Sequence, residues 1–108
     1  KYPLSCTADT PQPLLSSFRL HQNYPNPFNS STQITFELNR AGDVSLQVYN
    51  LIGQKVRTLV NGRKLVGTHR VKWNGRDDLG QPVASGVYIY CLSAGEHFVQ
   101  SRKMLLLR

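Results

Sequence analysis

From Phe18 onward, short runs of alternating apolar and polar residues recur about every 8 to 12 residues, separated by glycine, asparagine, aspartate and proline. A period of two is the period of a β-strand whose two faces meet different environments. Strands at this spacing are typical of two antiparallel sheets packed face to face. We therefore predict an all-β chain, an antiparallel β-sandwich of seven or eight strands with no helix.

Turn residues set the bounds of the expected strands. These strands cover 18–22, 32–39, 44–49, 54–60, 66–73, 86–94 and 97–107. In the second of them Ile34, Phe36 and Leu38 share one face, which predicts the core side. The Asn61-Gly62 dipeptide is a strong hairpin signal and predicts a turn there.

Residues 1–17 differ from the rest, because they hold three prolines among polar residues and show no period. They are predicted to be a flexible linker, and 18–108 a single domain. With 40% hydrophobic residues the chain is too apolar for a disordered tail. It contains no apolar run near the roughly 20 residues that span a bilayer, so no membrane span is expected.

The sequence offers little chemistry, and we expect no enzyme. There is no Gly-x-Ser-x-Gly nucleophile motif. Asp77 and Asp78 are adjacent, so in extended chain they would point to opposite sides rather than face each other across a substrate. The three histidines lack ligand spacing, and the loop 74–80 is interpreted as a turn held by Asx side chains. No metal and no cofactor are predicted.

The formal net charge is +7, and seven of the thirteen cations lie between Lys55 and Arg76. Such a patch can attract an anionic partner. No nucleic-acid-binding module fits, however, and aromatic residues do not interleave with the cations. A solvated basic face is predicted, with no nucleic acid as partner.

The two cysteines, Cys6 and Cys91, either form a disulfide or are independent thiols, and the sequence leaves both open. Gly86 and Tyr88 match part of the pattern of an immunoglobulin strand, but Cys91 comes one residue late. That offset turns Cys91 to the outer face, where no disulfide between the sheets can form. The predicted sandwich is immunoglobulin-like without the antibody disulfide.

Five segments in order resemble a known family. They are Leu20-His-Gln-Asn-Tyr-Pro-Asn-Pro-Phe-Asn29, Val48-Tyr-Asn-Leu-Ile-Gly53, Gly67-Thr-His-Arg-Val-Lys-Trp-Asn-Gly75, Gly80-Gln-Pro-Val-Ala-Ser-Gly-Val-Tyr88 and Arg102-Lys-Met-Leu-Leu-Leu-Arg108. Together they resemble the type A C-terminal sorting domain of the type IX secretion system, also called the Por secretion system sorting domain. Related sandwiches occur in flagellar hook-capping proteins.

The resemblance implies a secretion signal carried by a covalently attached upstream cargo domain. In that family the outer-membrane translocon recognises the domain, and a sortase then removes it and can anchor the cargo at the cell surface. The implied location is secreted or cell surface, reached through the periplasm and outer membrane of a Gram-negative bacterium.

The resemblance also implies where recognition occurs. The implied recognition residues are Asn26, Pro27, Phe28, Gly86, Tyr88, Lys103, Met104, Leu105, Leu106 and Leu107. For Gly86 and Tyr88 a structural role is favoured, and for Lys103 and the apolar tail both roles stay open. Cleavage is expected in the linker, between Thr7 and Ser17.

The alternative is an immunoglobulin-like adhesion or carbohydrate-binding module that stays attached to a secreted protein. Sugar binding would need a flat platform of exposed aromatic side chains. Tyr2, Tyr24 and Tyr49 are the candidates, and they lie in separate segments.

Overall fold

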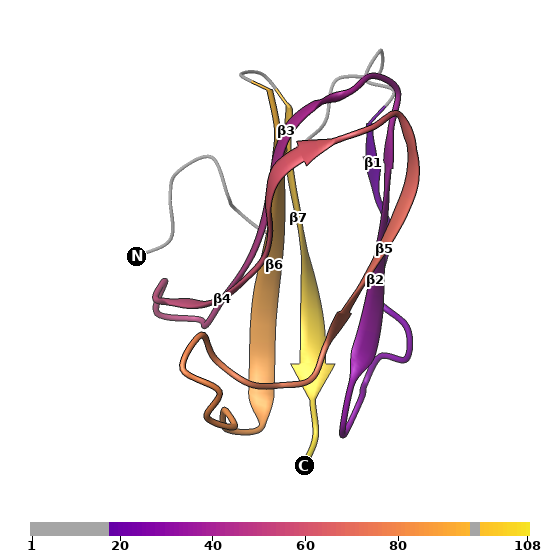
Figure 1. Ribbon diagram of the computed structural model, residues 1–108. Coiled ribbons are helices and arrows are strands. Elements are labelled where there is room, and N and C mark those ends of the chain that lie inside the picture. The colour runs from indigo at the N-terminus through magenta and orange to yellow at the C-terminus, as the bar shows by residue number, and fades with distance from the viewer. Residues whose placement is uncertain (1–17, 96–97) are drawn as a thin grey trace.

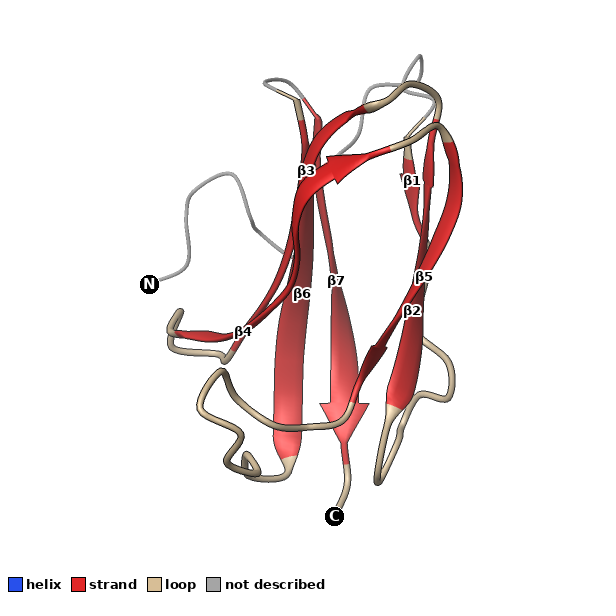
Figure 2. Cartoon of the chain, viewed as in Figure 1, coloured by secondary structure: helices blue, strands red, loops and turns tan. Residues whose placement is uncertain are grey.

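The computed structural model describes residues 18–95 and 98–108, and the predicted linker and cleavage region lie outside this part. Its strands are β1 (Arg19–Leu20), β2 (Thr32–Leu38), β3 (Gly42–Tyr49), β4 (Lys55–Lys64), β5 (Gly67–Trp73), β6 (Gly86–Ala94) and β7 (Phe98–Leu106) (Figure 1). Among the described residues the secondary structure consists of strands, without helices (Figure 2). Correspondingly, this part of the chain contains no helix long and apolar enough to cross a membrane.

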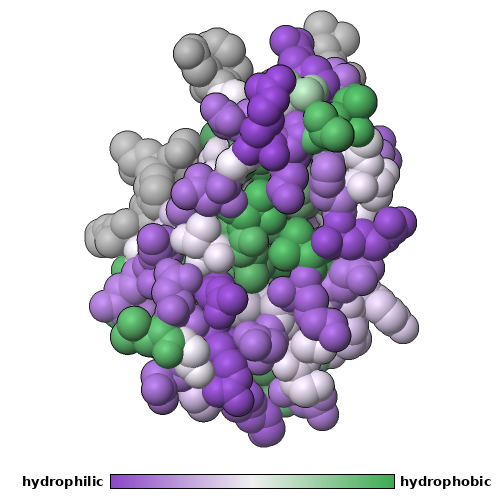
Figure 3. Space-filling view, viewed as in Figure 1, coloured by the Kyte–Doolittle hydropathy of each residue, from purple (hydrophilic) through white to green (hydrophobic). Residues whose placement is uncertain are grey.

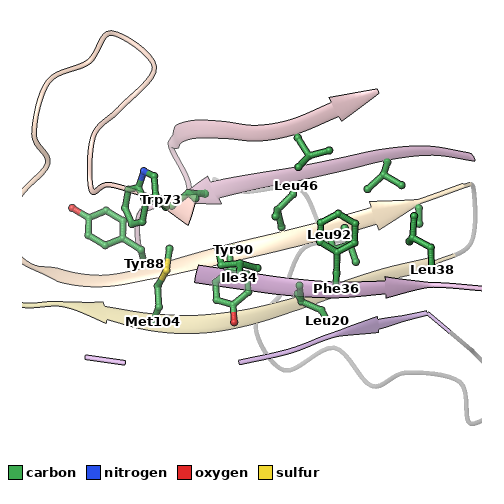
Figure 4. Close-up of a cluster of buried hydrophobic side chains, with 14 of the residues drawn as sticks. Leu20, Ile34, Phe36, Leu38, Leu46, Trp73, Tyr88, Tyr90, Leu92 and Met104 are labelled. Atoms are coloured by element: carbon green, nitrogen blue, oxygen red, sulfur yellow. The ribbon is translucent and has the colours of Figure 1, made fainter. Parts of the chain in front are cut away.

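The strands form two antiparallel sheets, one in the order β1-β2-β5 and the other in the order β4-β3-β6-β7. The sheets lie face to face, so the predicted all-β antiparallel sandwich is confirmed, with seven described strands. Alternation fixes its core: Ile34, Phe36 and Leu38 of β2 are buried, and they meet residues such as Leu46 and Leu92 from the other sheet (Figure 4).

The central strand β6 is buried on both faces. Tyr88, Tyr90 and Leu92 belong to the main core, whereas Cys91 forms a separate small cluster with Tyr49 and the partly buried Val99. Cys91 therefore lies on the outer face, as predicted, although it is only 2% exposed. Cys91 is disulfide-bonded, and the only other cysteine of the sequence, Cys6, lies outside the described residues.

The turn predicted at Asn61-Gly62 is wrong. Strand β4 runs through both residues to Lys64, with Asn61 opposite Ser45 and Gly62 opposite Val44 of β3. Pairing along the full length of β3 therefore outweighs the local preference of the dipeptide for a turn. Irregularities in the register between Leu46 and Gln47 and between Val48 and Tyr49 accommodate the longer β4. The first strand is also shorter than expected, because β1 holds two residues rather than 18–22.

The fully buried Tyr90 ties the segment after β1 to the middle of β6. Its hydroxyl donates to the backbone oxygen of His21 at 2.7 Å and accepts from the backbone N–H of Asn23 at 2.8 Å. Burial raises the pKa of the Tyr90 hydroxyl far above the ordinary value of 10.0. This hydroxyl therefore satisfies two backbone groups of the other layer.

Replacing Tyr90 with phenylalanine leaves these two backbone groups without their partner. We expect Tyr90→Phe to lower the free energy of unfolding at neutral pH by about 1–3 kcal/mol. The 80% exposed Tyr24 provides the control, since Tyr24→Phe should change stability by less than about 0.5 kcal/mol. Urea unfolding of the two variants measures both values, and equal midpoints would contradict the assignment.

The raised pKa of Tyr90 also predicts a pH dependence. Above pH 10.0 the unfolded chain loses the phenolic proton while the folded chain keeps it. Stability contributed by this group is therefore complete below that pH and falls as pH rises above it. Measured from pH 9 to 11 in steps of about half a unit, the decline should be smaller in Tyr90→Phe than in Tyr24→Phe. Parallel declines would contradict this prediction.

Candidate functional site

Two of the segments implicated by the sequence lie side by side in the structure. Phe28 forms a parallel bridge with Leu106 of β7. The Phe28 N–H donates to the backbone oxygen of Leu105 at 3.0 Å, and the Leu107 N–H donates to the backbone oxygen of Phe28 at 2.8 Å. Residues 26–28 and the end of β7 thus form one continuous surface, which we call the clasp.

Side chains extend the clasp along the edge of β7. The Leu105 N–H donates to Oδ1 of Asn26 at 2.9 Å, and Nε2 of Gln22 donates to the backbone oxygen of Lys103 at 2.7 Å. An edge strand normally offers unpaired backbone groups to other chains. Here residues before β2 satisfy part of that edge from within the same chain.

An aromatic cluster fixes the clasp to the core. The ring of Phe28, 3% exposed, packs against Trp73 with a centroid distance of 5.8 Å, and Trp73 packs edge-on against Tyr88 at 5.5 Å. Nε1 of Trp73 donates to the backbone oxygen of Arg76 at 2.9 Å, and the Tyr88 hydroxyl donates to that of Ala84 at 2.6 Å. Both polar atoms are therefore satisfied beside the buried rings.

The ten implicated residues divide by exposure. Buried side chains are those of Phe28, Tyr88, Met104 and Leu106; half-buried residues are Gly86 and Leu105; exposed ones are Asn26, Pro27, Lys103 and Leu107. The buried group holds the fold together, as interpreted for Tyr88 from the sequence. In the folded domain, a partner would meet the exposed group.

The clasp carries an open, mostly apolar depression. Pro25, Pro27, Phe28, Asn29 and Leu107 line it. Leu107 is 50% exposed, and the Tyr24–Pro25 and Asn26–Pro27 peptide bonds are both cis. The depression is thus built from both segments, and neither segment alone would form it.

Arg108 is a part of this region that the sequence reasoning missed. Its N–H donates to Oγ of Ser85 at 2.9 Å, its Nε donates to the backbone oxygen of Val83 at 2.8 Å, and its guanidinium also bonds the backbone oxygen of Gly75. A Cβ at Gly75, where φ is 71°, would lie 2.6 Å from the guanidinium. Glycine at position 75 was the available signal, since it permits this close approach.

The loop 74–80 behaves as the sequence predicts. Oδ1 of Asp77 accepts from the backbone N–H groups of Leu79 and Gln81, each at 2.9 Å, and Oδ1 of Asn74 accepts from that of Arg76 at 3.2 Å. These are Asx-type turns. Within the described ranges, no three His, Cys, Asp or Glu side chains gather in a way that could hold a metal ion.

The clasp generates a prediction for Asn26. Asn26→Ala removes the acceptor of the Leu105 N–H and should lower the free energy of unfolding by about 0.5–1.5 kcal/mol. Amide hydrogen exchange at Leu105 and Leu107 should accelerate together, because both bonds belong to the clasp. Asn29→Ala, a nearby exposed residue, is the control. Unchanged exchange at Leu105 in Asn26→Ala would show that the bond has no role in holding the clasp.

The solved structures that are similar to this chain include the following three. Dimeric latent PorU from Porphyromonas gingivalis has a TM-score of 0.68 and 18% identity, over 86% of this chain and 10% of that chain. PorZ of the same organism is described as an essential bacterial surface component of the type-IX secretion system. It has a TM-score of 0.56 and 23% identity, over 85% of this chain and 12% of that chain. FlgD from P. aeruginosa has a TM-score of 0.57 and 16% identity, over 87% of this chain and 78% of that chain.

The chain spans only about a tenth of the length of PorU and PorZ. At these identities the likeness concerns the fold. Comparison with curated protein sequences gives no match. The family model described as the FlgD Ig-like domain matches residues 22–97, which include β2 to β6 and the front of the clasp. The chain belongs to the FlgD Ig-like domain family.

Proposed function

We propose that this domain is a C-terminal secretion signal of the type IX secretion system. It directs an attached cargo protein across the outer membrane of a Gram-negative bacterium and is then cleaved, and the cargo is released or anchored at the cell surface. The observation that carries the proposal is the clasp. The two ends that the sequence resemblance marks for recognition form one surface, joined by backbone hydrogen bonds.

The clasp suits recognition of a folded domain. Its exposed residues include Pro27, Lys103 and Leu107, which are held on backbone that is hydrogen-bonded to a neighbouring segment. A surface ordered before binding loses less conformational entropy when a partner docks. We propose that the outer-membrane translocon docks on this surface, and that the sortase cuts the chain between Thr7 and Ser17.

The similarity to PorZ supports the setting of this proposal. PorZ carries the same sandwich and is itself described as a surface component of the type-IX secretion system. The similarity to FlgD is of the same strength, so the similar structures support the fold. The proposal of a secretion signal rests on the clasp.

The alternative, an adhesion or carbohydrate-binding module, has less support. A sugar platform needs several aromatic faces open to solvent. Tyr24 is 80% exposed, but Tyr49 is 6% exposed and belongs to the cluster with Cys91, and Tyr2 lies outside the described residues. Tyr24 and Tyr49 therefore do not form a common platform.

An export assay tests the proposal. Residues 1–108 are fused behind a periplasm-targeted fluorescent protein in a host that has this secretion system. The variant Lys103→Glu with Leu107→Ser changes two exposed side chains of the clasp, while the buried Met104 and Leu106 stay in place. Export should fall roughly tenfold, the effect of losing about 1.4 kcal/mol of docking free energy.

The matched control is Lys55→Glu with Leu79→Ser, which makes the same changes at exposed positions away from the clasp. It should be exported like the parent fusion, and thermal unfolding of the purified domains should show that both variants are folded. Equal export of clasp variant and control would refute recognition at the clasp. Retention of the unmodified fusion in the periplasm would refute the secretion signal itself.

A further inference from the structure

The two sides of the sandwich are closed differently. On the side of β1 and β7, the Leu20 N–H donates to Gln100 at 2.9 Å, Nε of Arg102 donates to the backbone oxygen of Leu20 at 2.6 Å, and the clasp continues the closure. The opposite side is formed by β4 and β5, which are the edge strands of their sheets.

On that opposite side the two strands are joined at both ends. At one end only Leu65 and Val66 connect β4 to β5, and Nε2 of His69 lies 2.7 Å from the backbone oxygen of Leu65. At the other end the loop after β5 contacts β4. The Asp78 N–H donates to the backbone oxygen of Val56 at 3.0 Å, and the Thr58 N–H donates to Oδ1 of Asp78 at 3.0 Å. Beyond these contacts β4 and β5 belong to different sheets, and no strand of the described chain pairs with the outer edge of β5. Between its two ends, this edge can accept a further strand.

Apolar side chains lie in the gap between these edges. Figure 3, which views this side, shows an apolar patch in a hollow between β4 and β5, surrounded by hydrophilic side chains. Val56 and Leu59 of β4 and Val71 of β5 are partly buried and pack against the core. A strand laid along β5 would cover this part of the core with its inward-facing side chains.

The outer face of β5 carries two exposed cations. Arg70 and Lys72 are exposed, and their partners across β2 are the uncharged Thr35 and Gln33. The ion pairs formed within the described ranges are His21–Glu37 and Arg57–Asp78, so neither cation has an acidic partner there. Opposite charges on adjacent strands stabilise their pairing, so this face favours acidic neighbours.

We propose that the free edge of β5 binds an extended polypeptide segment of alternating apolar and acidic residues, which adds to the sheet as a strand. The apolar residues cover Val71 and Leu59, and the acidic residues lie beside Arg70 and Lys72. Backbone hydrogen bonds to β5 supply affinity, and the alternation supplies specificity. This site goes beyond the proposed function and does not depend on it.

Other occupants satisfy fewer of these features. A second copy of the chain paired through β5 would bring the cations Arg70 and Lys72 of both copies together, on a chain whose net charge is already +7. An anionic membrane surface would neutralise the cations but would supply no row of backbone partners for the strand edge. A polypeptide of the stated pattern matches the edge, the apolar gap and the charge together.

The test uses the 108-residue chain and a hexapeptide of alternating valine and glutamate. Saturating peptide should slow amide hydrogen exchange within Gly67–Trp73 by about tenfold or more, as expected when a ligand at ten times its Kd occupies the edge. Two control peptides keep the length, one with three valines followed by three glutamates and one with lysine in place of glutamate. Neither should slow exchange at β5.

Variants of the chain identify the charges. Arg70→Glu with Lys72→Glu should weaken binding of the alternating peptide about tenfold. Arg19→Glu with Arg40→Glu makes the same change in net charge at other exposed positions and should bind like the parent chain. Equal protection by the block-order peptide, equal weakening in both variants, or no protection of β5 overturns the proposal. Loss of binding to phosphatidylglycerol vesicles in Arg70→Glu with Lys72→Glu, without peptide protection, would assign the patch to membranes instead.

Discussion

The backbone pairing of Phe28 with Leu106 is the contact on which the rest of the candidate site depends. It holds the Phe28 ring against Trp73, which in turn contacts Tyr88 of the facing sheet. Each such aromatic pair contributes about 0.5–1.5 kcal/mol beyond its burial. Buried side chains thus hold the backbone of the clasp, and this leaves its exposed side chains free to meet a partner.

A sandwich of two open sheets has two lateral sides, and in this domain contacts within the chain close one side more than the other. Side chains of Gln100 and Arg102 join β7 to β1, so that side is satisfied internally. The side of β4 and β5 keeps an unpaired edge beside cationic residues. Like charges at an edge discourage pairing between copies of the same chain. The same charges make the edge selective for an acidic strand.

The sequence predicts local features well and distant pairings poorly. Alternation in β2 places Ile34, Phe36 and Leu38 correctly, because period two follows directly from strand geometry. The turn predicted at Asn61-Gly62 is wrong, because the dipeptide's preference for a turn is local, whereas its pairing with β3 joins residues distant in the sequence. Tyr49 is a candidate surface aromatic in the sequence, yet its side chain is buried, because it packs with Cys91 and Val99. The clasp could not be derived from periodicity, because a parallel bridge between Phe28 and Leu106 leaves no local pattern.

The clasp also has a consequence for the order of folding during synthesis. Strands β2, β3, β4 and β5 are complete before β7 is made, whereas residues 26–28 must wait for residues 105–107. At about 5–20 residues per second the ribosome needs several seconds to cover that interval. A chain that stops short of β7 therefore presents no clasp, however well its first sheet has formed. A formed clasp therefore requires that translation has passed β7.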